Sequence, residues 1–178
     1  MDFARELAGG IVLRPVLRSD AGPLARAFQA NRSHLAPWEP VRNEEFYTVE
    51  GQRQVIERRR AELEAGTSLP LVLAGREDIV GLLTLNSIVR GAFQNAHVRY
   101  WISREVQGAG VMTAAVAAAV DLAGNGLCLH RLEAATLLHN KASQRVLEKN
   151  GFEAYGTAAA YLRIAGRWQD HRMHQRIL

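Results

Sequence analysis

The sequence predicts an α+β domain with a mixed, mostly antiparallel sheet flanked by helices, and two patterns support this. Three strand-like segments follow one another between residues 69 and 102, which is typical of an antiparallel meander. After residue 110, helical and strand-like segments alternate. The expected order is therefore β-α-α-β-β-β-α-β-α-β-β. A chain of 178 residues suits a single domain over residues 1–178, which can bury roughly 70% of the unfolded chain's surface.

The first elements are a strand and a helix, followed by a long connection. Residues 11–17 alternate as a strand, and Ser19 or Asp20 can cap a helix that ends near residue 30. Residues 31–47 show no clear period and include Pro37-Trp38-Glu39-Pro40. Compact domains rarely keep so long a connection without a functional reason. Residues 31–47 are therefore a candidate binding loop.

A second helix and the meander follow. The helix is expected over residues 48–65, because Gly66 breaks the pattern there. The strands are expected over residues 69–74, 79–89 and 96–102, with turn-forming residues at 75–78 between the first two.

In the second half of the chain, expected helices and strands alternate. An alanine-rich helix is expected over residues 110–123, a strand over 130–137, a helix over 141–150, and strands over 152–164 and 168–177. Gly151 is a suitable left-handed residue to close the 141–150 helix.

Composition excludes several classes of protein. Twenty-two Lys and Arg against eighteen Asp and Glu give a net charge of +4, and the densest basic run, residues 58–60, alternates with glutamates at helical spacing. A solvated helix face explains this run better than nucleic-acid contact, so no direct DNA binding is expected. Cys128 is the only cysteine, which excludes an intrachain disulfide and thiolate-rich metal sites. No metal, membrane span or signal peptide is expected, and we predict a cytoplasmic protein.

A glycine-rich turn lies between a predicted strand and a predicted helix. Gln107-Gly108-Ala109-Gly110-Val111 lets the backbone approach a ligand, and the helix start offers free N–H groups that suit a pyrophosphate. A tight turn without a ligand would use the same residues. A Rossmann fingerprint is excluded because three antiparallel strands come first and Thr113 stands where the third small residue belongs. A P-loop is excluded because Gly-Lys-Ser/Thr is absent.

A second group of candidate functional residues lies at the start of the 141–150 helix. Asn140 is suited to cap that helix by accepting the N–H of Ser143. Capping accounts for the asparagine. It does not decide whether Ser143 is an ordinary first-turn serine or a functional group.

Together these features resemble the acetyl-CoA-binding core of the GNAT superfamily of N-acetyltransferases. The resemblance rests on the meander, the Gly-x-Gly turn, Asn-x-x-Ser at Asn140 and Ser143, and the helix end at residues 149–152. Residues 37–42, 89–93, 139–141 and 161–171 resemble the RimJ-type branch, the ribosomal-protein-alanine N-acetyltransferases. The similarity spans residues 11–178.

The resemblance implies a cofactor site for acetyl-CoA. The third meander strand would separate from the next strand at a bulge, and the pantetheine arm would pair with its exposed backbone. The residues implied for this arm are Trp101, Ile102 and Ser103. The backbone of Gln107, Gly108, Ala109, Gly110, Val111 and Met112 would hold the pyrophosphate, with Asn140 as a further cofactor contact. Ser143 inherits the role of acid toward the departing thiolate, because Leu147 stands where many members carry a tyrosine.

The general base is left open among three residues. His97 stands where related enzymes often carry glutamate, Glu39 lies in the candidate binding loop, and His171 follows Asp170. Each residue also has a purely structural interpretation. His97 would be a histidine paired within the sheet, Glu39 an exposed loop carboxylate, and His171 part of an ordinary polar pair on a strand. The expected groove for the acceptor involves Trp38, Glu39, Tyr100 and His171, with Trp168 as a further aromatic.

Two residues depart from the family pattern. Glu105 places an anion before the glycine turn, where it does not help a pyrophosphate, and Arg99 replaces a small residue and is expected to narrow or charge the acceptor cleft.

The expected enzyme transfers acetyl from acetyl-CoA to a protein N-terminal amine, and the favoured acceptor is the N-terminal alanine of a ribosomal protein. An α-amine suits direct attack because its ordinary pKa, about 7.7–8.0, leaves much of it neutral. Two alternatives remain: an acetyltransferase for small amines, and a CoA-binding ribosome-assembly factor. The sequence predicts no oligomeric state.

Overall fold

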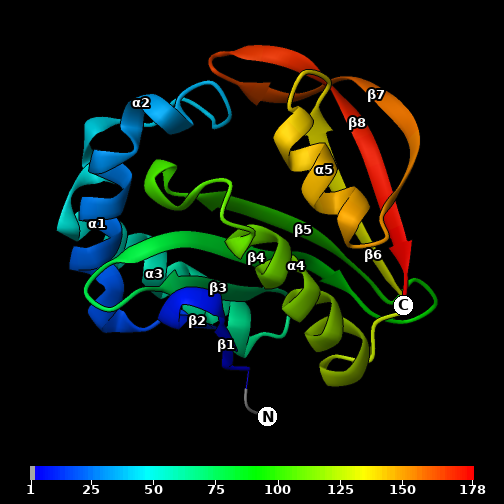
Figure 1. Cartoon of the computed structure of the whole chain (residues 1–178), viewed down its shortest axis with the longest axis horizontal. Helices are drawn as coiled ribbons and strands as arrows, with labels where there is room; N and C mark the ends of the chain where they lie inside the picture. Colours follow the sequence, from blue (N-terminus) through cyan, green and yellow to red (C-terminus); the bar gives the residue numbers. More distant parts are fainter. Residues whose placement is uncertain (1–2) are drawn as a thin grey trace.

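The computed structural model describes residues 3–178 and confirms the α+β fold. Figure 1 shows helices on both sides of one strongly twisted sheet. The strands are β1 (Arg5–Leu7), β2 (Ile11–Pro15), β3 (Leu69–Ala74), β4 (Ile79–Val89), β5 (Asn95–Ile102), β6 (Arg131–Leu137), β7 (Glu153–Ile164) and β8 (Arg167–Ile177). The α-helices are α1 (Ala21–Ala30), α2 (Arg32–Leu35), α3 (Val49–Glu64), α4 (Val111–Asp121) and α5 (Lys141–Lys149).

The sheet is divided where β5 meets β6. The strand order is β1-β2-β3-β4-β5-β6-β8-β7, and all neighbours are antiparallel except β5 and β6. These two strands pair only from Asn95↔Arg131 to His97↔Glu133 and then diverge. Figure 1 shows the resulting V between β5 and the β6–β8–β7 half. A register shift accompanies this separation, and it lies in β4 between Asn86 and Val89.

Two apolar clusters cover the two faces of the sheet. One packs α4 against Leu83, Ala96 and Leu132, and the other packs α1 and α3 against Val72 and Leu82. Side chains on β5 therefore alternate between the faces, with Ala96 and Val98 toward α4 and Trp101 toward α1. This alternation decides which residues of β5 face each side of the cleft described below.

The structure adds elements that the sequence patterns did not predict. The three-residue strand β1 is too short to show a period, and the four-residue helix α2 lies inside the candidate binding loop. The helix expected over residues 110–123 continues past α4 as one π-helical turn, Leu122–Gly126. No helix among residues 3–178 is long and apolar enough to cross a membrane.

Gly51 in the first turn of α3 is required by close packing. A Cβ at this position would overlap the carbonyl oxygen of Glu45 in the preceding turn. We expect Gly51→Ala to lower the free energy of unfolding by roughly 3 kcal/mol, because backbone atoms must move apart. Gly22→Ala is the matched control: it lies in the first turn of α1 with its nearest atom 3.7 Å away, and should stabilise by about 0.5–1 kcal/mol. Chemical denaturation of both variants checks this prediction, and equal effects would contradict it.

His174 on β8 couples stability to pH. Its side chain is buried, and burial lowers the pKa of the imidazole. The folded state therefore favours the neutral ring, so stability is fully present above the unfolded pKa of about 6.5 and falls as pH drops through and below that value. We expect the Tm of the wild type to fall between pH 7.5 and 5.5, and to fall less in His174→Leu. A fall of the same size in both proteins would contradict this assignment.

Candidate active site

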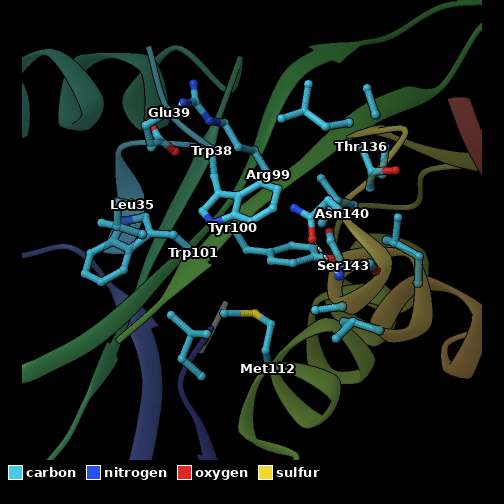
Figure 2. A pocket seen from close by; sticks show the side chains of 18 of the residues that line it. Leu35, Trp38, Glu39, Arg99, Tyr100, Trp101, Met112, Thr136, Asn140 and Ser143 are labelled. Carbon is cyan, nitrogen blue, oxygen red and sulfur yellow. Dashed lines mark hydrogen bonds and ion pairs between the residues drawn. The ribbon is translucent and has the colours of Figure 1, made fainter. Parts of the chain in front are cut away.

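A cleft of about 760 Å³ lies where β5 and β6 separate. Residues from β5, β6, α4, α5, the candidate binding loop and the tip of the β7–β8 hairpin line it. Figure 2 shows Trp38 and Tyr100 in the middle of the cleft, with Asn140 and Ser143 on the α5 side and Glu39 and Arg99 on the opposite side. Of the predicted site residues, those that line the cleft are Trp38, Glu39, His97, Tyr100, Trp101, Ile102, Gln107, Gly108, Gly110, Val111, Met112, Asn140, Ser143 and His171.

The candidate binding loop crosses from one half of the sheet to the other. The Trp38 ring lies 5.4 Å from the His139 ring, and the N–H of Ala165 donates to the Glu39 carbonyl at 3.0 Å. His139 precedes α5 and Ala165 belongs to the β7–β8 turn. The loop therefore spans the opening of the V.

The glycine turn leads directly into α4. Gly108 and Gly110 have φ angles of 83° and 80°, which favour glycine, and Gly110 is the N-cap of α4. The N–H groups of the first turn have no intrahelical acceptor and give the helix end a positive potential. Ala109 is exposed in this turn but does not line the cleft. The turn can hold an anion by its backbone alone.

Replacing Gly108 tests this anion site. We expect Gly108→Val to raise the dissociation constant for acetyl-CoA by about tenfold or more, because a branched side chain holds a pyrophosphate away from the backbone N–H groups. Gly91→Val is the control, since Gly91 has a similar φ of 72° and equally open surroundings but lies in the β4–β5 turn. Calorimetric titration measures both, and equal affinities in the two folded variants would remove the assignment.

The backbone of β5 is free on one side beyond His97. Ser103 N–H donates to Val80 on β4, so the N–H groups of alternate residues such as Trp101 also face β4, while the backbone of Tyr100 and Ile102 faces the gap. The Ile102 carbonyl lies 3.2 Å from His34 Nε2.

The side chains of the other two residues predicted for the pantetheine arm have structural partners. The Trp101 ring packs 4.9 Å from Phe28 in the core, and buried Ser103 Oγ donates to Asn31. Ile102 is thus the one of the three predicted residues whose backbone is open to the gap.

Ser143 is held by contacts from two elements. Its N–H donates to Asn140 Oδ1 at 3.1 Å, which is the expected cap of α5. Its hydroxyl oxygen lies 2.8 Å from the Tyr100 hydroxyl. Burial raises the pKa of Tyr100 to about 12, with the hydrogen bond from Ser143 acting in the opposite direction. Tyr100 is therefore a neutral phenol at physiological pH and can donate to Ser143.

His97 and Glu133 meet at the apex of the V, where β5 and β6 separate. His97 Nε2 lies 3.5 Å from Glu133 Oε2, and His97 lines the cleft. Buried Glu133 also accepts hydrogen bonds from Asn95, Arg131 and Tyr155 at 3.0–3.2 Å. Burial alone would raise the pKa of Glu133, but the hydrogen bonds from Arg131 and Asn95 keep it below its usual value. A fixed carboxylate thus stands behind the imidazole.

Glu39 and His171, the other two candidate bases, already have partners. Glu39 Oε2 accepts from Arg99 at 2.7 Å and from Arg42 at 3.1 Å. His171 is buried, and its Nδ1 lies 2.9 Å from the Gln169 carbonyl oxygen.

The chain matches a protein family and close relatives. Residues 11–153 match the acetyltransferase (GNAT) domain. The chain is 36% identical to the probable N-acetyltransferase YjcK of Bacillus subtilis, over 92% of this chain and 91% of that protein. It is 34% identical to the [ribosomal protein uS5]-alanine N-acetyltransferase of Escherichia coli, over 90% and 84% of the two chains. The solved structure of Mycobacterium smegmatis RimJ in complex with CoA-disulfide superposes with a TM-score of 0.92 at 33% identity, over 98% and 85% of the chains.

The chain belongs to the GNAT acetyltransferase family. It is an acetyl-CoA-dependent N-acetyltransferase, and the cleft between β5 and β6 is its candidate active site. The cleft residues fit acetyl-CoA because an uncovered glycine turn and an unpaired strand edge lie along the same opening.

Several residues of this GNAT cleft were not predicted as site residues. Arg145 and Lys149 on α5 bring two cations into the cleft, and Thr136 has a buried hydroxyl without a hydrogen-bond partner among residues 3–178. Glu133 was also missed. The sequence carries no signal for it, because a glutamate inside a strand becomes a candidate only when the pairing of β5 with β6 places it beside His97.

Proposed function

We propose that this GNAT enzyme acetylates the α-amine of a protein N-terminus, with the N-terminal alanine of a ribosomal protein as the first acceptor to test. The observation that carries the proposal is that β5 presents different groups on its two faces. Tyr100 contacts Ser143 on the α5 side, whereas His97 and Arg99 belong to the opposite face with the binding loop. One cleft can thus receive a donor from one face and an acceptor from the other. Similarity to the uS5-alanine enzyme supports the acceptor class.

On the donor side, acetyl-CoA supplies the thioester. We assign the pyrophosphate to the backbone of residues 107–112 and the pantetheine arm to the strand edge at Ile102, with Asn140 beside it. Tyr100 can donate to Ser143 Oγ, which leaves the Ser143 proton directed to the departing sulfur.

On the acceptor side, we assign the role of base to His97. A neutral imidazole can keep its proton on Nε2, 3.5 Å from Glu133 Oε2, and use Nδ1 to accept a proton from the amine. Glu39 is a weaker candidate, because two guanidinium groups already occupy its Oε2.

The decisive experiment offers purified enzyme a panel of acceptors with acetyl-CoA and measures release of the CoA thiol. The panel contains a peptide with N-terminal alanine, the same peptide with a blocked N-terminus, and small primary amines. We expect turnover with the free peptide only, and mass spectrometry should place one acetyl group on its α-amine. Turnover with small amines alone would overturn the acceptor class. Binding of acetyl-CoA without any turnover would favour the CoA-binding assembly factor.

A further inference from the structure

Two arginines donate to one carboxylate at the acceptor end of the cleft, and a third lies within electrostatic range of it. Arg42 from the binding loop and Arg99 from β5 both donate to Glu39 Oε2. Figure 2 shows the Arg99 side chain extending from β5 toward Glu39. Arg59 from α3 is the third: burial lowers its pKa to about 10, and Arg99, Glu39 and Arg42 are the next strongest influences. We call Glu39, Arg42, Arg59 and Arg99 the arginine cluster.

The arginine cluster is not balanced within the protein. Guanidinium groups stay protonated at physiological pH, so three positive charges face one negative charge. Arg42 Nε and Arg59 Nη1 are buried without a hydrogen-bond partner among residues 3–178. Buried donors without acceptors are costly, and a carboxylate bound beside Arg99 would supply negative charge that the arginine cluster lacks.

The arginine cluster lies within reach of the proposed base. Arg99 and His97 are two residues apart on one strand, so they share a face and their Cα atoms are about 7 Å apart. An extended acceptor also advances about 3.4 Å per residue. A carboxylate that reaches Arg99 while the α-amine lies at His97 therefore belongs to the second or third residue of the acceptor.

We propose that the arginine cluster is a carboxylate-binding subsite, so that the enzyme prefers N-termini with Asp or Glu at the second or third position. This inference rests on the proposed function and deepens it. Glu39 then acts as the internal ligand that keeps Arg99 and Arg42 in place and competes with the acceptor carboxylate. The uncompensated positive charge also favours the neutral form of the incoming amine, as direct attack requires.

The test compares matched peptides with amidated C-termini. Each begins with alanine and carries Glu or Gln at position two, or Glu or Gln at position three. We expect kcat/KM to be about tenfold higher for one Glu peptide than for its Gln partner, mainly through KM, and we expect this ratio to fall at high salt. A C-terminal carboxylate could supply the same chemistry, so dipeptides with free and amidated C-termini form a second arm.

Variants that are expected to change the Glu/Gln ratio in opposite directions separate a binding subsite from a purely structural role. Arg99→Gln should bring the Glu/Gln ratio toward one, whereas Glu39→Gln should raise it by freeing Arg99. Arg26→Gln is the control, because Arg26 is an exposed arginine paired with Asp78 and lines neither cavity. It should leave the ratio unchanged.

The outcomes distinguish this inference from the proposed function. Equal rates for the Glu and Gln peptides would overturn the subsite but leave the N-terminal activity standing. A Glu/Gln ratio that stays the same in Arg99→Gln would have the same consequence. Calorimetric titration of the same peptides into the CoA-saturated protein measures the preference even without turnover. A carboxylate preference in binding with no acetylation would retain the subsite and overturn the proposed function.

Discussion

Ser143→Ala is expected to lower kcat by about tenfold or more while the dissociation constant for acetyl-CoA changes little. In the proposed role the hydroxyl donates to a sulfur that gains negative charge only as the thioester breaks, so this hydrogen bond would be stronger in the transition state than in the ground state. Tenfold corresponds to roughly 1.4 kcal/mol, which is within the range of one hydrogen bond to a charged group. Pre-steady-state thiol release and calorimetric titration measure the two quantities separately.

Tyr100→Phe is the companion variant, because it removes the hydroxyl that contacts Ser143 Oγ and keeps the ring in place. We expect a loss in kcat of about two- to tenfold, smaller than for Ser143→Ala, and almost no further loss in the double variant. The pKa of Tyr100 of about 12 predicts no basic limb from this residue in the pH–rate profile below pH 10. If Ser143→Ala changes only the KM for acetyl-CoA, Ser143 is a binding residue and another group or water protonates the sulfur.

Much of the fold is encoded in short-range patterns that can be read directly. The meander is visible because β3, β4 and β5 alternate or are continuously apolar between turn residues, and α5 is visible because Asn140 and Gly151 mark its ends. The helix α2 was missed because its four residues, Arg32–Leu35, are too few for a period and depend on Leu35 packing into the α1–α3 core. The π-helical turn after α4 likewise depends on tertiary packing around Leu122 and Ala123.

The two sides of the candidate site differ in how much the sequence reveals. The glycine turn and the Asn140–Ser143 pair are local, since each uses backbone groups of nearby residues, so their spacing is visible in the sequence and fits an anion site and a helix start. The acceptor side joins residues far apart in the chain. Glu39 and Arg99 are 60 positions apart, and His97 and Glu133 meet only because β5 and β6 pair in parallel. Composition and spacing do not record such contacts.

In the proposed mechanism, His97 and Glu133 divide the work of base catalysis between them. His97 is the residue open to the cleft, and Glu133 is buried and held by Asn95, Arg131 and Tyr155. We therefore expect Glu133 to act as a positioning residue that favours the proton on the Nε2 atom of His97. Its partners keep it ionised, so the imidazole is oriented before an acceptor arrives.

His97→Ala is expected to lower kcat/KM for an N-terminal peptide by about a hundredfold, the lower end of the range for general bases, because part of the α-amine is already neutral. Added imidazole should restore part of the rate, since it can enter the space of the deleted ring. Glu133→Gln should lose about tenfold in kcat without rescue by imidazole and with unchanged affinity for acetyl-CoA. His130→Ala is the control, because exposed His130 does not line the cleft. Wild-type kinetics in His97→Ala would rule out His97 and leave His171 and Glu39 as the bases to test.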